Sequence, residues 1–121
     1  MTLPRLIDTL LALHRALIDW TKREYERDHG PVGNPYALFA LVSQDPAFQW
    51  LQPLTRLLVE LEELRDRRAP PIAPEEVSGA AERIRLLLVS TEAGFAAKIR
   101  LAVESHQGAT ASHRALGELM G

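Results

Sequence analysis

The chain has 121 residues, a length that fits one domain, residues 1–121, built around a single hydrophobic core. Apolar residues make up 46% and charged residues 25%, and the formal net charge is −2, which is ordinary globular composition. Because there is no cysteine, disulfides, thiolate zinc sites and cysteine nucleophiles are excluded. A protein that binds nucleic acid usually carries a basic face or a basic total charge, and neither is visible in this chain.

No segment has the pattern of a signal peptide or a membrane span. Asp8 and Arg15 interrupt the apolar stripe near the N-terminus, so no continuous apolar stretch forms there. No run approaches the ~18 apolar residues that a membrane helix requires. We therefore expect a cytoplasmic protein that does not associate with a membrane.

The first predicted helix covers about residues 3–29. Thr2 is a suitable N-cap, and Pro4 fits the first turn, where a missing N–H costs nothing. Apolar residues recur with the three-and-four spacing of one buried helical face, at Leu3, Leu6, Ile7, Leu10, Leu11, Leu17 and Ile18. The pair Gly30-Pro31 should end the helix, because glycine accepts the left-handed conformation and proline cannot continue the helix.

Two pairs in which proline follows Asn or Asp mark the next helix starts. Asn34-Pro35 predicts a short helix at about 35–43, and Asp45-Pro46 predicts a new start at residue 46. Pro53 lies seven residues into this second helix. It should kink the helix, or divide it into a short turn and a longer segment that runs to about Arg67.

A proline-rich linker at 69–74 precedes the last long helix. The helical period continues from Pro74 or Glu75 past Gly94, which predicts one helix to about Ser105, with a bend allowed at Gly94. Residues 107–121 should form either a weak extra helix or a mobile tail. The predicted fold is all-α: an antiparallel four-helix bundle with one short helix, one helix kinked at Pro53 and room for a C-terminal fifth.

Two histidines lie on the buried stripes of the long helices. His14 belongs to the first helix and His106 to the last, so in an antiparallel bundle they could meet and share a metal ion with a nearby glutamate. The helical motif Glu-x-x-His occurs once, from Glu26 to His29, and His-Glu-x-x-His is absent. The favoured interpretation is therefore hydrogen-bonded core histidines, with no metal or cofactor, and a metal site at these two residues is the alternative.

Aromatic residues gather in one stretch. Tyr36, Phe39, Phe48 and Trp50 are four of the seven aromatics and fall within fifteen residues. Such side chains bury large areas and also anchor interfaces. A core role is the first interpretation, and the alternative is an interaction surface, to which we add Phe95 of the last helix. Small residues at 93, 94, 96 and 97 also allow close helix packing, within one chain or between two copies.

The segment from Asp45 to Leu54 reads Asp-Pro-x-Phe-x-Trp-Leu-x-Pro-Leu. With the flanking residues of the first half of the chain, it resembles a group of small uncharacterised bacterial helical proteins. The resemblance implies a bacterial, cytoplasmic protein and assigns no catalytic residue. Residues from Ala69 onward have no counterpart in that resemblance.

Two classes of function follow from these observations. No catalytic triad, phosphate loop or dinucleotide fingerprint is present, so the pattern favours a protein that is not an enzyme. The first hypothesis is an interaction or scaffold protein that forms a homodimer or binds a protein partner through the aromatic segment or the last helix. The second is a bundle that binds a ligand or metal, or catalyses a reaction, at His14 and His106. The first predicts an exposed apolar patch, and the second predicts both histidines in one polar cavity.

Overall fold

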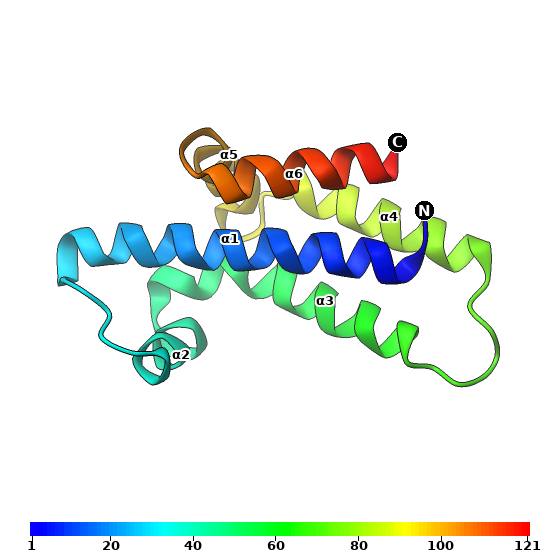
Figure 1. The fold of residues 1–121 in the computed structure, drawn as a ribbon, viewed down its shortest axis with the longest axis horizontal. Coiled ribbons are helices and arrows are strands. Elements are labelled where there is room, and N and C mark those ends of the chain that lie inside the picture. The colour runs from blue at the N-terminus through cyan, green and yellow to red at the C-terminus, as the bar shows by residue number, and fades with distance from the viewer.

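A computed structural model describes all residues, 1–121, as helices joined by short connections, with no strand (Figure 1). The all-α class predicted from the sequence is confirmed. The elements, in chain order, are α1 (Leu3–His29), α2 (Pro35–Gln44), the 3₁₀ turn η1 (Pro46–Leu51), α3 (Gln52–Arg65), α4 (Pro74–Leu88), the 3₁₀ turn η2 (Glu92–Gly94), α5 (Phe95–Ser105) and α6 (Gln107–Met120). No helix is both long enough and apolar enough to span a membrane.

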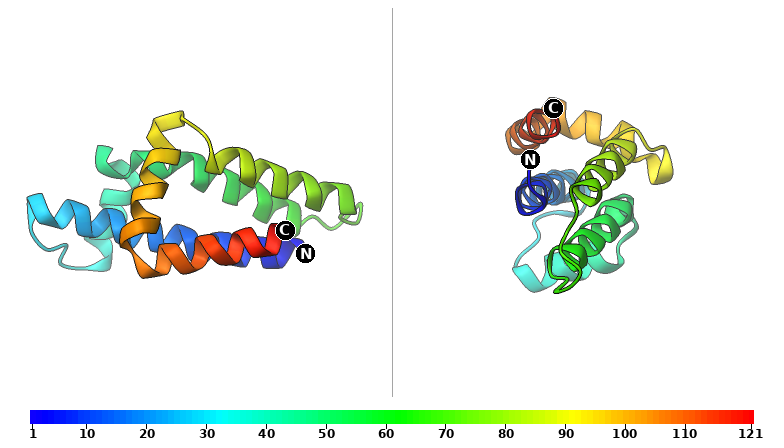
Figure 2. Two further views of the ribbon diagram at one scale, coloured as in Figure 1. Left: turned by 90° about the horizontal axis from the view of Figure 1, so that it is seen from above. Right: turned by 90° about the vertical axis from the view of Figure 1, so that its right-hand side faces the viewer.

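Helix α1 is the central element of the fold. The Thr2 hydroxyl accepts a hydrogen bond from the Arg5 N–H at its start, and Gly30 ends it with a positive φ of 81°, as the sequence predicts. It packs most extensively against α6 and then against α3, and both of these helices run antiparallel to it (Figures 1 and 2). Since α1 meets neighbours on several sides, its apolar face is wide.

The predicted starts after residues 34 and 45 are confirmed. The side chains of Asn34 and Asp45 cap α2 and η1 by accepting backbone N–H groups of Ala37 and Ala47. Pro53 divides the segment rather than kinking it: the chain forms the 3₁₀ turn η1 and then starts α3 one residue before Pro53. Proline is accommodated there because the first turn of a helix requires no N–H.

Arg67 holds the connection between α3 and α4 in place. Its guanidinium donates hydrogen bonds to the carbonyls of Pro70 and Pro71. It also donates one hydrogen bond of 2.8 Å to each of the two carboxylate oxygens of Glu76. The Glu76 carboxylate also accepts the N–H of Ala73 at 3.1 Å. The bonds from Arg67, followed by the one from Ala73, lower the pKa of Glu76 to about 2.

The single long helix predicted from residue 74 to about residue 105 is wrong. The chain leaves the helix after Leu88, takes left-handed backbone angles at Ala93 (φ 53°) and Gly94 (φ 71°), and starts α5 at Phe95. The Ser90 hydroxyl accepts the N–H of Glu92, a local bond that competes with the helical one. The break lets α5 cross the molecule from α4 toward α6, whereas one continuous helix would be a straight rod (Figure 2).

Residues 107–120 form α6, so of the two alternatives for this segment the structure has the helix. Ala109 and Leu116 are fully buried, and α6 lies along α1 for much of its length (Figure 1). Helices α1, α3, α4 and α6 follow the long axis of the molecule, and α5 crosses it (Figures 1 and 2). The four helices predicted from the sequence are not the same four. The prediction included the short α2 and treated α4 and α5 as one helix.

Candidate functional site

The five aromatic residues predicted for an interaction surface divide into two groups. Phe48, Trp50 and Phe95 are 1%, 2% and 0% exposed, whereas Tyr36 and Phe39 are 87% and 73% exposed. The first three lie in the hydrophobic core, so their assignment to a surface is corrected. A folded protein can present only Tyr36 and Phe39 to a partner.

Trp50 is the centre of a buried aromatic group. Its ring lies 6.0 Å from that of Trp20, edge to face, and 5.4 Å from that of Phe95. Its indole N–H donates to the hydroxyl of buried Thr21 at 3.2 Å. Trp20 and Thr21 lie on α1, far along the chain from Trp50, and no motif in the sequence links them to it. The one available signal was that Trp20 widens the apolar stripe of α1.

His14 makes its hydrogen bond within the bundle. Its Nε2 lies 3.2 Å from the Thr55 hydroxyl, and that hydroxyl donates its own hydrogen to the Leu51 carbonyl. Both contacts are satisfied together when the Thr55 oxygen accepts the Nε2–H of His14 while its hydroxyl donates to Leu51. Burial lowers the pKa of His14, because it disfavours the charged imidazolium.

His106 caps helix α6. Its Nδ1 accepts the N–H of Ala109 at 3.1 Å, and its Nε2 lies 2.8 Å from a carboxylate oxygen of Asp19. Because Nδ1 accepts, Nε2 carries the hydrogen and donates it to Asp19. Both ring nitrogens are therefore used within the chain, and His106 links the start of α6 to α1.

The structure does not bring the two histidines to one site. His14 bonds to α3, and His106 bonds to Asp19 of α1 and to the first turn of α6. No group of three or more His, Cys, Asp or Glu side chains is placed to hold a metal ion. The shared polar cavity that the metal hypothesis requires is not formed by His14 and His106.

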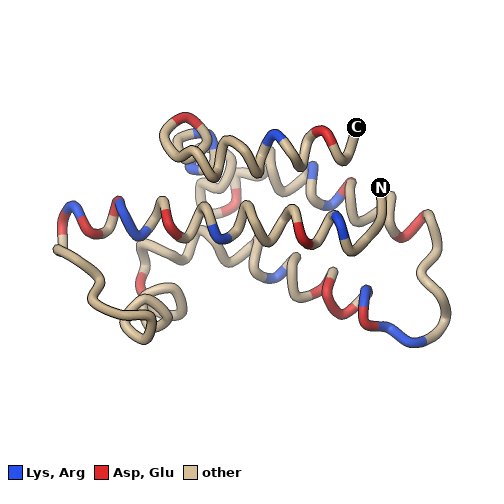
Figure 3. The backbone as a smooth tube through the Cα atoms, viewed as in Figure 1, with Lys and Arg blue, Asp and Glu red and all other residues tan.

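Helix α2 presents an apolar stripe to solvent. Four of its exposed residues follow helical spacing, namely Tyr36, Phe39, Ala40 and Ser43, and we call them the α2 stripe. The opposite side packs against the core through Leu38, Leu41 and Val42, which are half-buried. No residue of the short helix α2 is charged, whereas charges of both signs are spread over the longer helices (Figure 3).

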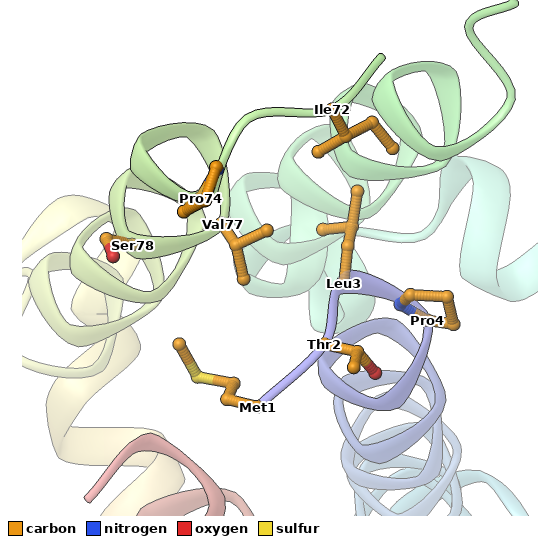
Figure 4. A pocket seen from close by; sticks show the side chains of 8 residues that line it. All are labelled: Met1, Thr2, Leu3, Pro4, Ile72, Pro74, Val77 and Ser78. Carbon is orange, nitrogen blue, oxygen red and sulfur yellow. The ribbon is translucent and has the colours of Figure 1, made fainter.

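The surface also has shallow hollows, of which the one in Figure 4 has a volume of about 430 Å³. It lies where the start of α1 meets the residues around the start of α4, and its walls include Leu3, Ile72 and Val77. Its polar side chains are those of Thr2 and Ser78, and apart from the α-amino group of Met1 no charged group lies among its lining residues. The hollow therefore has little polar chemistry with which to orient a ligand.

A second hollow, of about 280 Å³, lies beside the buried aromatic group. Glu24, which lines it, is paired with Arg27 at 3.1 Å, and the Lys98 ammonium lies 5.8 Å from the ring centre of Trp50. This ammonium is close enough to the Trp50 ring for a cation–π interaction. Glu24 and Lys98, two of the charged residues that line this second hollow, thus already have partners within the chain.

No protein-family model, no curated protein and no solved structure matches this chain. The chain's own residues are therefore the basis for a functional assignment. They define an all-α protein whose most distinctive surface feature is the uncharged, aromatic α2 stripe.

Proposed function

We propose that the protein is a non-enzymatic interaction module that self-associates as a homodimer through the α2 stripe. The observation that carries this proposal is the exposure of Tyr36 and Phe39, at 87% and 73%, on a helix without a charged or a buried residue. Large aromatic side chains are enriched at protein interfaces, and a monomer gains nothing by holding two of them in water. The resemblance of residues 45–54 adds a bacterial, cytoplasmic setting to the proposal.

The order of residues along the stripe suits pairing with a second copy. The large side chains, Tyr36 and Phe39, lie toward the N-terminal end of α2, and the small ones, Ala40 and Ser43, toward its C-terminal end. In an antiparallel pair of α2 helices related by a two-fold axis, the large residues of each copy meet the small residues of the other. No like charges oppose each other, because α2 has no charge.

The expected affinity is modest. Burying a large apolar side chain contributes roughly 1.5–3 kcal/mol, so four aromatic side chains in a dimer contribute about 6–12 kcal/mol. Association itself costs about 4 kcal/mol or more in lost translational and rotational freedom. The upper end of this range, about 12 kcal/mol less about 4, corresponds to a dimer with a dissociation constant of about a micromolar, which is the affinity we expect.

Sedimentation velocity over a concentration series from low to high micromolar tests the proposal. The wild type should shift from monomer to dimer, and the double variant Tyr36→Ser/Phe39→Ser should remain a monomer throughout. The matched control is Leu86→Ser/Leu101→Ser, which removes two side chains that are 60% and 55% exposed on other helices. This control should dimerise like the wild type.

Two results would overturn the proposal. One is a wild type that stays monomeric over the whole series. The other is a Tyr36→Ser/Phe39→Ser variant that dimerises as well as the wild type. Thermal melts of all three proteins establish that each is folded, and both pairs of substitutions should leave the melt intact because the side chains are exposed.

A further inference from the structure

A third hollow, of about 300 Å³, lies between the end of α4, one face of α5 and the middle of α6. Helix α5 forms its floor through residues at helical spacing, among them Ile99, Arg100 and Val103. Val89, just after α4, lines one side, and His113 of α6 lines another. We call this site the α5 hollow. Its walls are mainly apolar, and its size is at the lower end of the range for small-molecule pockets.

The charged and polar groups of the α5 hollow are basic and lack partners. Arg100 and His113 take part in none of the ion pairs of the chain. The histidine side chains that form hydrogen bonds are His14, His29 and His106, so His113 forms none. No acidic residue lines the hollow; Glu104, one turn beyond Arg100, lies outside its lining. Arg100 and His113 therefore line the hollow without a counter-charge from the chain.

The hollow between α3 and α4 provides the contrast. It is also lined by arginines, but Arg56 pairs there with Glu92, and Arg83 pairs with Glu60. Its charges are satisfied within the chain and leave no net preference for a ligand of either sign. The α5 hollow combines apolar walls with a net positive charge, and a ligand would need the complement of both.

We infer that the α5 hollow binds a small amphipathic carboxylate, a monoanion with a short hydrocarbon tail. The carboxylate accepts hydrogen bonds from the Arg100 guanidinium, which matches carboxylate geometry with two parallel N–H groups. The His113 imidazole adds a further donor. The tail lies on Ile99 and Val103 and covers Val89, which is 72% exposed without a ligand. The volume of about 300 Å³ is at the lower end for ligand pockets, which favours a short tail.

Titration of ¹⁵N-labelled protein with hexanoate, followed by amide chemical shifts, tests the inference. Saturable shifts are expected at Ile99, Val103 and His113. Acetate, which lacks the tail, and hexanol, which lacks the charge, should each bind at least about tenfold more weakly, because each loses one half of the recognition.

Variants separate the site from general attraction to a basic surface. Arg100→Gln should weaken hexanoate binding about tenfold or more, the loss expected for one charged hydrogen-bonding partner. The matched control is Arg114→Gln, which removes an exposed arginine of α6 that has no ion pair and does not line the hollow. It should leave the binding within about twofold of the wild type.

The inference is overturned if hexanoate gives no saturable shifts, if hexanol binds as tightly as hexanoate, or if Arg100→Gln and Arg114→Gln have equal effects. The test is independent of dimer formation, because no residue of the α2 stripe lines the hollow. Tyr36→Ser/Phe39→Ser should therefore bind hexanoate like the wild type.

Discussion

The hydrogen bond between Thr21 and Trp50 allows a quantitative test of the buried aromatic group. Thr21 is 4% exposed; its hydroxyl donates to the Leu17 carbonyl at 2.7 Å and accepts the indole N–H of Trp50 at 3.2 Å. Thr21→Val keeps the shape of the side chain but leaves that N–H without a partner. Because Trp50 is only 2% exposed, its indole N–H is largely shielded from bulk water that could replace the lost oxygen. An unsatisfied buried donor costs about 1–3 kcal/mol.

This loss can be expressed as a shift in melting temperature. Unfolding entropies of about 2.1 cal/mol/K per residue give about 0.25 kcal/mol/K for a chain of 121 residues, so 1 kcal/mol corresponds to about 4 °C. Thr21→Val should therefore lower the melting temperature by about 4–12 °C. Urea titration followed by tryptophan fluorescence should show the same loss in the free energy of unfolding.

A double-mutant cycle with Trp50→Phe isolates the hydrogen bond from the other effects of the substitution. Phenylalanine has no N–H, so Thr21→Val should be nearly neutral in the Trp50→Phe background. If Thr21→Val destabilises the protein equally in both backgrounds, the hydrogen bond between Thr21 and Trp50 does not stabilise the fold and the reasoning is refuted.

Three further predictions concern pH and backbone conformation. Burial lowers the pKa of His14 below 6.5, so the stability linked to its neutral form is complete above about pH 6.5 and is lost as the pH falls toward the lower folded-state value. The difference in melting temperature between about pH 7.5 and pH 5 should therefore be smaller for His14→Gln than for the wild type. An equal difference in the two proteins would contradict the prediction. The pKa of Glu76 is lowered to about 2, mainly by Arg67, so Glu76→Gln should have a smaller free energy of unfolding in urea than the wild type at pH 7. The free energies of unfolding of the two proteins should become equal as the pH falls from about 4.5 to 2. A difference that persists at pH 2 would exclude this linkage. Gly94→Ala should lower the free energy of unfolding by about 1–2 kcal/mol, because φ is 71° at this residue, although open space surrounds the new methyl group. Gly117→Ala, inside α6 and with equally open surroundings, should raise the free energy of unfolding by up to about 1 kcal/mol. Differential scanning calorimetry should show melting temperatures that shift in opposite directions, and shifts of the same sign would disprove the backbone explanation.

Local sequence signals determined the helix class and most helix ends. Thr2, Asn34 and Asp45 each cap a helix with their own side chain, and Gly30 ends α1 in a conformation that suits glycine. The division at Pro53 follows from the missing N–H of proline. These features depend on residues within one or two turns of each other, so the linear sequence contains the information needed to predict them.

The candidate sites were less predictable, because burial is decided by which helices meet. Composition identified a dense aromatic segment, but it could not separate Tyr36 and Phe39 on the surface from Phe48 and Trp50 in the core. The α5 hollow brings together Val89, which follows α4, Arg100 of α5 and His113 of α6, and no motif marks them in the sequence.

The sequence by itself thus determined an all-α chain, its caps and its stop signals, because these are short-range preferences of the backbone. Only the tertiary structure decided that the helical period from residue 74 to residue 105 is broken. The left-handed angles at Ala93 and Gly94 are unfavourable locally for alanine, and they are compensated by packing that buries Phe95 against Trp50 and lays α6 along α1. The same packing gives His14 and His106 separate partners. Contacts between residues far apart in the chain outweighed the local periodicity at this point, and periodicity alone contains no information about such contacts.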